Sequence, residues 1–160
     1  MDFLSELTAV MEEEIRVGER LLGNLADQKK AIISWNSSDL LRRVEEKETL
    51  IQGLGVMEES RRSIMAHLLR RETNLSLRDL LGQLSPGPLA TKLESLKQEA
   101  REIYTRLRAE EKGVVTLLQL LVGHLREALG TLSDFTANLY EQGGNPASPP
   151  RVSRLVQTKI

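Results

Sequence analysis

The chain has 160 residues, a formal net charge of −1, 28% charged residues and only 3% aromatic residues. This length is typical of one domain with one hydrophobic core, and the composition requires a mainly aliphatic core of the kind that helical bundles use. The near-zero net charge gives no general attraction to nucleic acid or acidic lipid, and the absence of cysteine excludes disulfides and thiolate zinc sites.

The first 16 residues, MDFLSELTAVMEEEIR, carry acids where a signal peptide needs a basic segment and an unbroken apolar run. The longest apolar cluster, Val114 to Val122, falls far short of the ~20 residues that cross a bilayer. We therefore expect a cytoplasmic protein without a membrane-inserted segment.

The first predicted helix spans about residues 3–33, because mostly apolar residues recur there at alternating spacings of four and three. This seam consists of Leu4, Thr8, Met11, Ile15, Gly18, Leu22, Leu25, Lys29 and Ile32, and Leu7 and Leu21 widen it. The opposite, solvent-facing side is predicted to hold Glu12, Glu13, Glu14, Arg16, Glu19 and Arg20.

A short polar break follows, in which Ser37 or Ser38 is predicted to cap a second helix of about residues 38–71. Its predicted seam is Leu41, Val44, Glu48, Ile51, Leu54, Glu58, Arg61, Met65 and Leu68. Three of these positions are polar, namely Glu48, Glu58 and Arg61. We expect them at the edge of the seam, since buried ion pairs are costly to desolvate. The alternative is that they pair with each other or with a neighbouring helix.

A third, short helix is predicted at about residues 76–84, capped by Ser76 and ended by the sequence Ser85-Pro-Gly-Pro. The fourth helix, about residues 88–141, starts with Pro88 in its first turn. Its seam runs through Leu89, Leu93, Leu96, Ala100, Ile103, Leu107, Val114, Leu118, Leu121, Leu125, Leu132, Phe135 and Leu139. At 1.5 Å per residue, this helix would be about 75 Å long, too long for one two-helix hairpin to cover.

The predicted fold is therefore all-α: an antiparallel helical bundle or coiled coil of three long helices and one short helix. We place this bundle in residues 1–142. Residues 143–160 contain two glycines, three prolines and three bases without an acid, and we predict a flexible, disordered C-terminal tail.

Apolar residues lie almost all round the fourth helix between Val114 and Val122. A helix that packs on one side needs only an apolar stripe. Either the short helix or the hairpin covers the second face, or that face is a groove for another helix, from a partner or from a second copy.

The residues that could carry chemistry do not form a reactive site. His67 lies in a His-x-Leu-Arg sequence that partly matches a histidine-phosphotransfer motif, but Arg71 stands where that motif has glycine. Neither His67 nor His124 follows a glutamate at the spacing of di-iron bundles, and nucleotide-binding and hydrolase motifs are absent. Basic pairs such as Arg42-Arg43 alternate with acids, unlike a nucleic-acid-binding stripe. We predict no enzymatic activity, cofactor, metal or nucleic-acid ligand.

Two stretches resemble the FlgN family of flagellar type III export chaperones. The first is EEKETLIQGLGVMEESRR, in which Glu46, Glu48, Leu50, Ile51, Leu54 and Arg61 match that family's Glu, Leu and Arg positions. The second is the end of the chain, where LYEQGG, with Tyr140 and Gly143, and the basic segment VSRLVQTKI are similar to the family's C-terminus.

This resemblance implies a cytosolic chaperone that binds the C-terminal helical segments of hook-associated (hook–filament junction) proteins and brings them to the flagellar export gate. The residues expected to contact the client are Leu117, Leu118, Leu121, Leu125, Val152, Leu155 and Val156. Tyr140 is the candidate for contact with the export gate, and packing over the bundle is its alternative role. The rival function is a self-assembling coiled-coil adaptor, such as a homodimer, with Val114–Val122 as its seam; a histidine-phosphotransfer domain is a further alternative.

Overall fold

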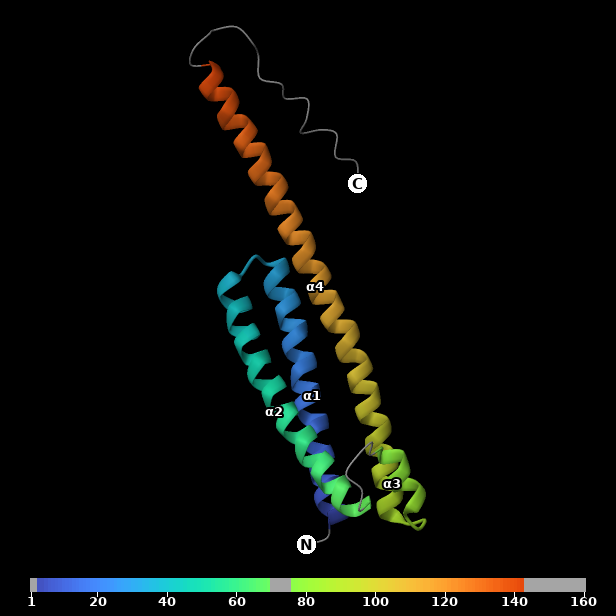
Figure 1. Ribbon diagram of the computed structural model, residues 1–160. Coiled ribbons are helices and arrows are strands. Elements are labelled where there is room, and N and C mark those ends of the chain that lie inside the picture. Colours follow the sequence, from blue (N-terminus) through green and yellow to red (C-terminus); the bar gives the residue numbers. More distant parts are fainter. Residues whose placement is uncertain (1–2, 70–75, 143–160) are drawn as a thin grey trace. The chain divides into compact units, whose positions relative to one another are not determined.

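The computed structural model describes residues 3–69 and 76–142, with side-chain positions given as far as Asn138. These residues form four helices and no strand: α1 (Phe3–Ile33), α2 (Ser37–Leu69), α3 (Leu77–Gln83) and α4 (Pro88–Gln142) (Figure 1). The predicted all-α fold of three long helices and one short helix is thus confirmed, and the predicted bounds are correct to within two residues where they can be compared. The tail predicted at 143–160 lies outside the described residues.

Close contacts divide the chain into two units, residues 1–118 and 119–160. The first unit contains α1, α2, α3 and the first part of α4, and the second contains the remainder of α4. The predicted division into a bundle of residues 1–142 and a separate tail stays a prediction.

In the first unit, α2 folds back antiparallel to α1, and α4 runs parallel to α1 (Figure 1). Two ion pairs between α1 and α4 show that these helices are parallel. Near the start of both helices Lys92 contacts Glu12 at 2.7 Å, and near the end of α1 Lys29 contacts Glu110. Both residue numbers increase together, as parallel helices require.

Helix α1 is buried on two sides. The side that faces α4 includes Gly18, where an added Cβ atom would lie only 2.6 Å from Cγ2 of Ile103. The side that faces α2 includes Glu14 and Asn24, which contact Arg61 and Arg43 of α2. Because α1 has two neighbours, its buried set is much wider than a single seam. It consists of Leu7, Thr8, Met11, Glu14, Ile15, Val17, Gly18, Leu21, Asn24, Leu25, Gln28, Ala31 and Ile32.

The placement of Glu14 on the solvent-facing side of the first helix was wrong. This residue is only 5% exposed, and its carboxylate accepts hydrogen bonds from Nε of Arg61 at 3.0 and 3.1 Å. Burial raises the pKa of Glu14 and outweighs the opposing effect of the Arg61 guanidinium. The same surroundings raise the pKa of Tyr104 on α4, chiefly through burial and then through the charge of Glu14.

The first half of the predicted α2 seam is displaced by one residue. The buried and half-buried side chains of α2 include the series Leu40, Arg43, Lys47, Leu50, Leu54, Met57, Arg61, Ile64 and Leu68. The predicted members Leu41, Val44 and Ile51 are exposed instead. Glu48 and Glu58 are exposed, in agreement with the predicted position at the edge of the seam. Arg61 instead forms an ion pair with Glu14 of α1.

Basic side chains occupy this seam because acids on both neighbouring helices neutralise them. Arg43 contacts Asp27 of α1 at 3.2 Å, and Lys47 contacts Glu111 of α4 at 2.8 Å. Their aliphatic stems cover apolar surface while the charged groups reach these partners.

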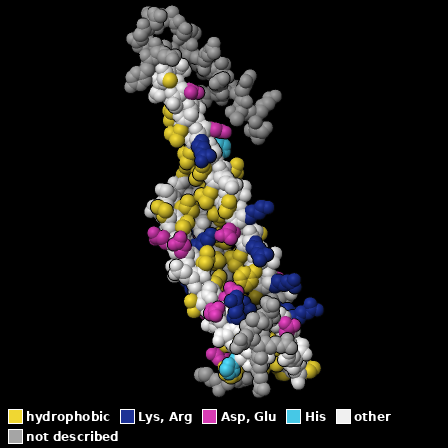
Figure 2. Space-filling model, viewed as in Figure 1, with side chains coloured by type: hydrophobic (Ala, Val, Ile, Leu, Met, Phe, Trp, Pro, Cys, Tyr) yellow, Lys and Arg dark blue, Asp and Glu magenta, His cyan; other side chains and the backbone are white. Residues whose placement is uncertain are grey.

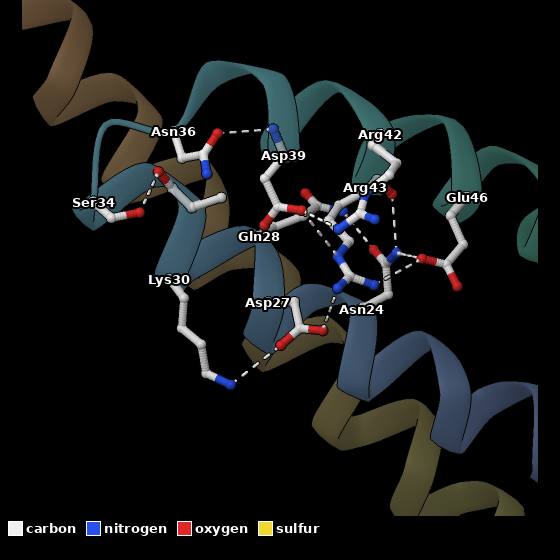
Figure 3. A network of polar contacts seen from close by, with 11 residues as sticks. Asn24, Asp27, Gln28, Lys30, Ser34, Asn36, Asp39, Arg42, Arg43 and Glu46 are labelled. Carbon is white, nitrogen blue, oxygen red and sulfur yellow. Dashed lines mark hydrogen bonds and ion pairs between the residues drawn. The ribbon is translucent and has the colours of Figure 1, made fainter.

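A polar network joins α1 to α2 near the turn between them (Figure 3). The Asn24 side-chain amide donates to the backbone carbonyl of Arg43 at 2.9 Å and to Glu46 at 3.1 Å. Gln28, which is also buried, donates to the Asn24 side-chain oxygen at 2.7 Å. A slip of one residue between the helices would leave these buried groups without partners, so the network specifies the register of the hairpin.

The turn between α1 and α2 has an uncommon backbone conformation. Trp35 adopts φ = 56°, and the N–H of Trp35 donates to the Ile32 carbonyl while the N–H of Asn36 donates to that of Ala31. This is the Schellman C-cap, whose left-handed position is usually glycine. The Asn36 side chain then accepts from the N–H of Asp39 at 3.0 Å, so Asn36 caps α2 and the predicted Ser37 or Ser38 cap was wrong.

We expect Trp35→Gly to raise the free energy of unfolding by about 0.5–1 kcal/mol. Glycine adopts the left-handed conformation without the strain that a Cβ atom causes. The free energy gained from the relieved strain exceeds the cost of the additional conformational entropy that glycine loses on folding. Chemical denaturation measures the change. The control is Trp35→Ala, which removes the indole but retains Cβ; a gain for alanine as large as that for glycine would contradict the backbone explanation.

The two later helix starts follow their sequence signals. The Ser76 hydroxyl accepts from the N–H of Asp79 at 3.1 Å, which confirms the predicted cap of α3. Helix α4 begins at Pro88, as predicted from the position of that proline.

Candidate partner-binding surface on helix α4

Helix α4 is buried along a single stripe in the first unit. Its buried apolar side chains there are Leu93, Leu96, Ile103, Leu107 and Val114. All of them belong to the predicted seam, which is confirmed for this part of the helix. Leu117 and Leu118, the last two residues of the first unit, are half-buried.

In the second unit most of the described apolar positions of α4 are exposed. Leu125 is 44% exposed, Leu129 65%, Leu132 59% and Phe135 55%. These four residues, which we name the α4 row, are separated by four, three and three positions and so share one face of the helix. Leu120 and Val122 are exposed as well, and Leu121 is half-buried. Figure 2 shows hydrophobic side chains on the visible surface of this part of α4.

The acidic residues of this part of α4 lie away from the row. Glu127 and Asp134 fall on the opposite face at 100° per residue, and each is exposed. The positions beside the row include Val122, Thr131 and Thr136, which are uncharged, and the basic residues His124 and Arg126 at its edges. Contiguous exposed apolar surface without interspersed charge is typical of a surface that another protein covers.

The structure places the predicted client-contact residues as follows. Leu125 is exposed and belongs to the α4 row, whereas Leu117, Leu118 and Leu121 are half-buried. Tyr140 lies within α4, but its side chain is outside the described set. The tail candidates Val152, Leu155 and Val156 also lie outside it.

Sequence reasoning did not include Leu129, Leu132 and Phe135 in the candidate site. The last two belonged to the predicted seam of the fourth helix, which was already expected to be too long for one hairpin to cover. The signal that could have identified them was length, since α4 has 55 residues whereas α1 and α2 have 31 and 33.

Other candidate sites bring together no reactive groups. His67 is exposed, and its ring lies 4.7 Å from that of Phe3, a contact between two helices of the hairpin. His124 lies 4.0 Å from Glu127 on the surface. Within the described ranges, no three His, Cys, Asp or Glu side chains converge in a way that could hold a metal ion. None of the helices described here combines the length and apolar character needed to cross a membrane.

A row of exposed apolar side chains on a helical scaffold is typical of proteins that bind other proteins. The family model described as "FlgN protein" matches residues 1–148, and the chain therefore belongs to the FlgN family of flagellar export chaperones. This is a chaperone family rather than a family of enzymes. No curated protein and no solved structure matches the chain significantly.

Proposed function

We propose that this chain binds hook-associated proteins in the cytoplasm, through their C-terminal helical segments, and delivers them to the flagellar export gate. Membership of the FlgN family supports the general role, and the exposed α4 row is the observation that supports the binding mode. An amphipathic helix of a client can bury its apolar face against such a row.

The row offers enough apolar surface for specific binding. Burying one leucine or phenylalanine side chain contributes about 1.5–3 kcal/mol. The α4 row contains four such side chains, which are between 44% and 65% exposed. Among the described residues, Arg126 is the one formally charged side chain beside the row, so the row offers little of the electrostatic selectivity that coiled coils obtain from flanking charges. Clients would therefore be selected mainly by shape and apolar pattern.

The proposed client site includes Leu117, Leu118, Leu121 and Leu125 of α4, extended by Leu129, Leu132 and Phe135. The tail residues Val152, Leu155 and Val156 would add a second, basic and apolar contact. Tyr140 is the proposed contact with the export gate.

The test is a binding measurement between the full chain and the C-terminal segments of the hook-associated proteins encoded in the same genome. We expect the double variant Leu125→Ser/Leu132→Ser to bind about 100-fold more weakly, since each lost leucine contact costs about tenfold in affinity. Both residues are exposed, so the free energy of unfolding should stay within about 0.5 kcal/mol of that of the unmodified chain.

The matched control is Val56→Ser, which removes an even more exposed apolar side chain from α2. This variant should bind clients normally. Deletion of residues 145–160 should weaken binding while the helix content stays constant. Equal client affinity of the unmodified chain and the double variant would contradict the proposed site.

Self-association through the α4 row is the second candidate function, because an uncharged apolar row is also complementary to itself. Light scattering over a range of concentrations distinguishes the two. A self-assembling adaptor would be favoured if the unmodified chain forms a stable homodimer, the double variant is monomeric, and the chain binds no hook-associated protein.

A further inference from the structure

The turn between α1 and α2 exposes three large apolar side chains that the proposed client site does not use. Ile33, at the end of α1, is 68% exposed, Trp35 in the turn is 63% exposed, and Leu41 in the second turn of α2 is 65% exposed. We name residues 30–42 the hairpin tip. Three such side chains are thus exposed within nine residues at the closed end of the hairpin.

Trp35 occupies a backbone position at which tryptophan is disfavoured. Its φ of 56° lies in the left-handed region, where a Cβ atom introduces strain and glycine is the usual residue. Because most of the side chain is exposed, burial within the chain does not offset this strain. A strained, exposed tryptophan is expected where the side chain contacts another molecule.

The outward charge of the hairpin tip is positive. The side chains of Lys30 and Arg42 are 78% and 69% exposed, whereas those of their ion-pair partners Asp27 and Asp39 are 34% and 27% exposed. Both aspartates also contact Arg43 between the helices. Figure 3 shows Asp27 in contact with both Lys30 and Arg43, so that Arg43 shares this carboxylate with the more exposed lysine. The carboxylates are therefore turned inward and the two cations outward.

We propose that the hairpin tip binds the surface of a bilayer that contains anionic lipids. Trp35, Ile33 and Leu41 would enter the interface between headgroups and acyl chains, where an indole places its ring in apolar surroundings and its N–H near polar groups. Lys30 and Arg42 would contact lipid phosphates. The chain would rest on the membrane without crossing it, and since its net charge is −1, the attraction depends on these local cations.

A lipid surface fits the hairpin tip better than a protein partner does. A specific protein interface buries about 800 Å² on each side and requires a complementary surface around its apolar anchors. The hairpin tip offers three large exposed apolar side chains, whereas a fluid lipid interface accepts a few such groups without a preformed pocket.

Trp35 is the single tryptophan of the chain, so its fluorescence reports directly on the hairpin tip. The full chain is mixed with vesicles of phosphatidylcholine alone, or with one-third phosphatidylglycerol, and binding is measured by sedimentation and by tryptophan emission. We expect a blue shift and co-sedimentation with the anionic vesicles, both reduced at least fivefold on raising the salt concentration from 50 to 500 mM, roughly as screening requires.

Two sets of variants test the contributions of the apolar and basic residues. Ile33→Ser/Leu41→Ser keeps the reporter, and we expect it to bind anionic vesicles at least about tenfold more weakly. Its control is Val56→Ser, which removes an exposed apolar residue elsewhere on α2. Lys30→Gln/Arg42→Gln should abolish the preference for anionic vesicles, whereas Arg62→Gln, which alters a similarly exposed arginine, should retain it. Circular dichroism verifies that every variant retains its helices.

Absence of binding to anionic vesicles, or binding without a change in Trp35 emission, would overturn the proposal. An emission shift on addition of an acidic polypeptide, but not of anionic vesicles, would assign the tip to a protein partner instead. This inference is independent of the proposed function, because Leu125→Ser/Leu132→Ser should bind vesicles normally even where it fails to bind clients.

Discussion

Replacing Arg61 by leucine should lower the free energy of unfolding by about 3 kcal/mol at neutral pH. Arg61 is the ion-pair partner of Glu14, whose side chain is only 4% exposed. Removing one partner of a buried pair leaves an uncompensated charge, and this cost typically exceeds what the pair itself contributes. Urea denaturation measures the loss, with Arg62→Leu as the matched control, since Arg62 is largely exposed and pairs only on the surface.

The double variant Glu14→Leu/Arg61→Leu separates the cost of the unpaired charge from the loss of packing. We expect its stability to return to within about 1 kcal/mol of that of the unmodified chain, because two apolar side chains need no partner. If Arg61→Leu were as mild as Arg62→Leu, the pair between Arg61 and Glu14 would contribute nothing to the fold.

The loss caused by Arg61→Leu should also depend on pH. The pKa of Glu14 in the folded chain is raised above 4.5, its value without burial. A raised pKa means that the folded state holds the proton more tightly, so this group favours folding below pH 4.5 and loses that contribution as the pH rises through the folded-state pKa. Removing Arg61 raises this pKa further. The stability difference between variant and unmodified chain should therefore be small near pH 4.5 and increase toward neutral pH.

Gly18→Ala should lower the free energy of unfolding by about 1–2 kcal/mol. The new Cβ would lie 2.6 Å from Cγ2 of Ile103, which is itself buried, so α1 and α4 would have to move apart or Ile103 would have to leave its preferred rotamer. Overpacking of this kind costs about 1–3 kcal/mol, and the higher helix propensity of alanine returns up to about 1 kcal/mol.

The same helix offers a control for Gly18→Ala. A Cβ at Gly23 would meet nothing within 4 Å, and we expect Gly23→Ala to stabilise the chain by about 0.5–1 kcal/mol. In a double-mutant cycle, Ile103→Ala should remove most of the cost of Gly18→Ala, because it deletes the methyl group involved. Destabilisation by both glycine substitutions, or additive effects in the cycle, would contradict close packing between Gly18 and Ile103.

The candidate site was predictable in part. The apolar residues from Leu118 to Phe135 were evident in the sequence, but their periodicity is the same whether a neighbouring helix of the same chain, a second copy or a client covers them. Leu132 and Phe135 therefore belonged to the same predicted seam as Leu93 and Leu107, although the first two are exposed and the last two are buried. Which members of a seam are covered depends on the lengths of the neighbouring helices and on how they align.

Sequence by itself determined the helices, their ends and the family of this protein. Proline, glycine and capping residues act locally, and a repeat of three and four positions identifies one face of a helix without knowledge of its surroundings. The tertiary structure decided which polar residues are buried. Glu14 and Asn24 belong to the core because α1 has α2 on one side and α4 on the other, and Arg61 belongs to the α2 seam because Glu14 lies opposite it. Burial of a charge depends on a partner that is distant in the sequence, and only the packing of the helices brings the two together.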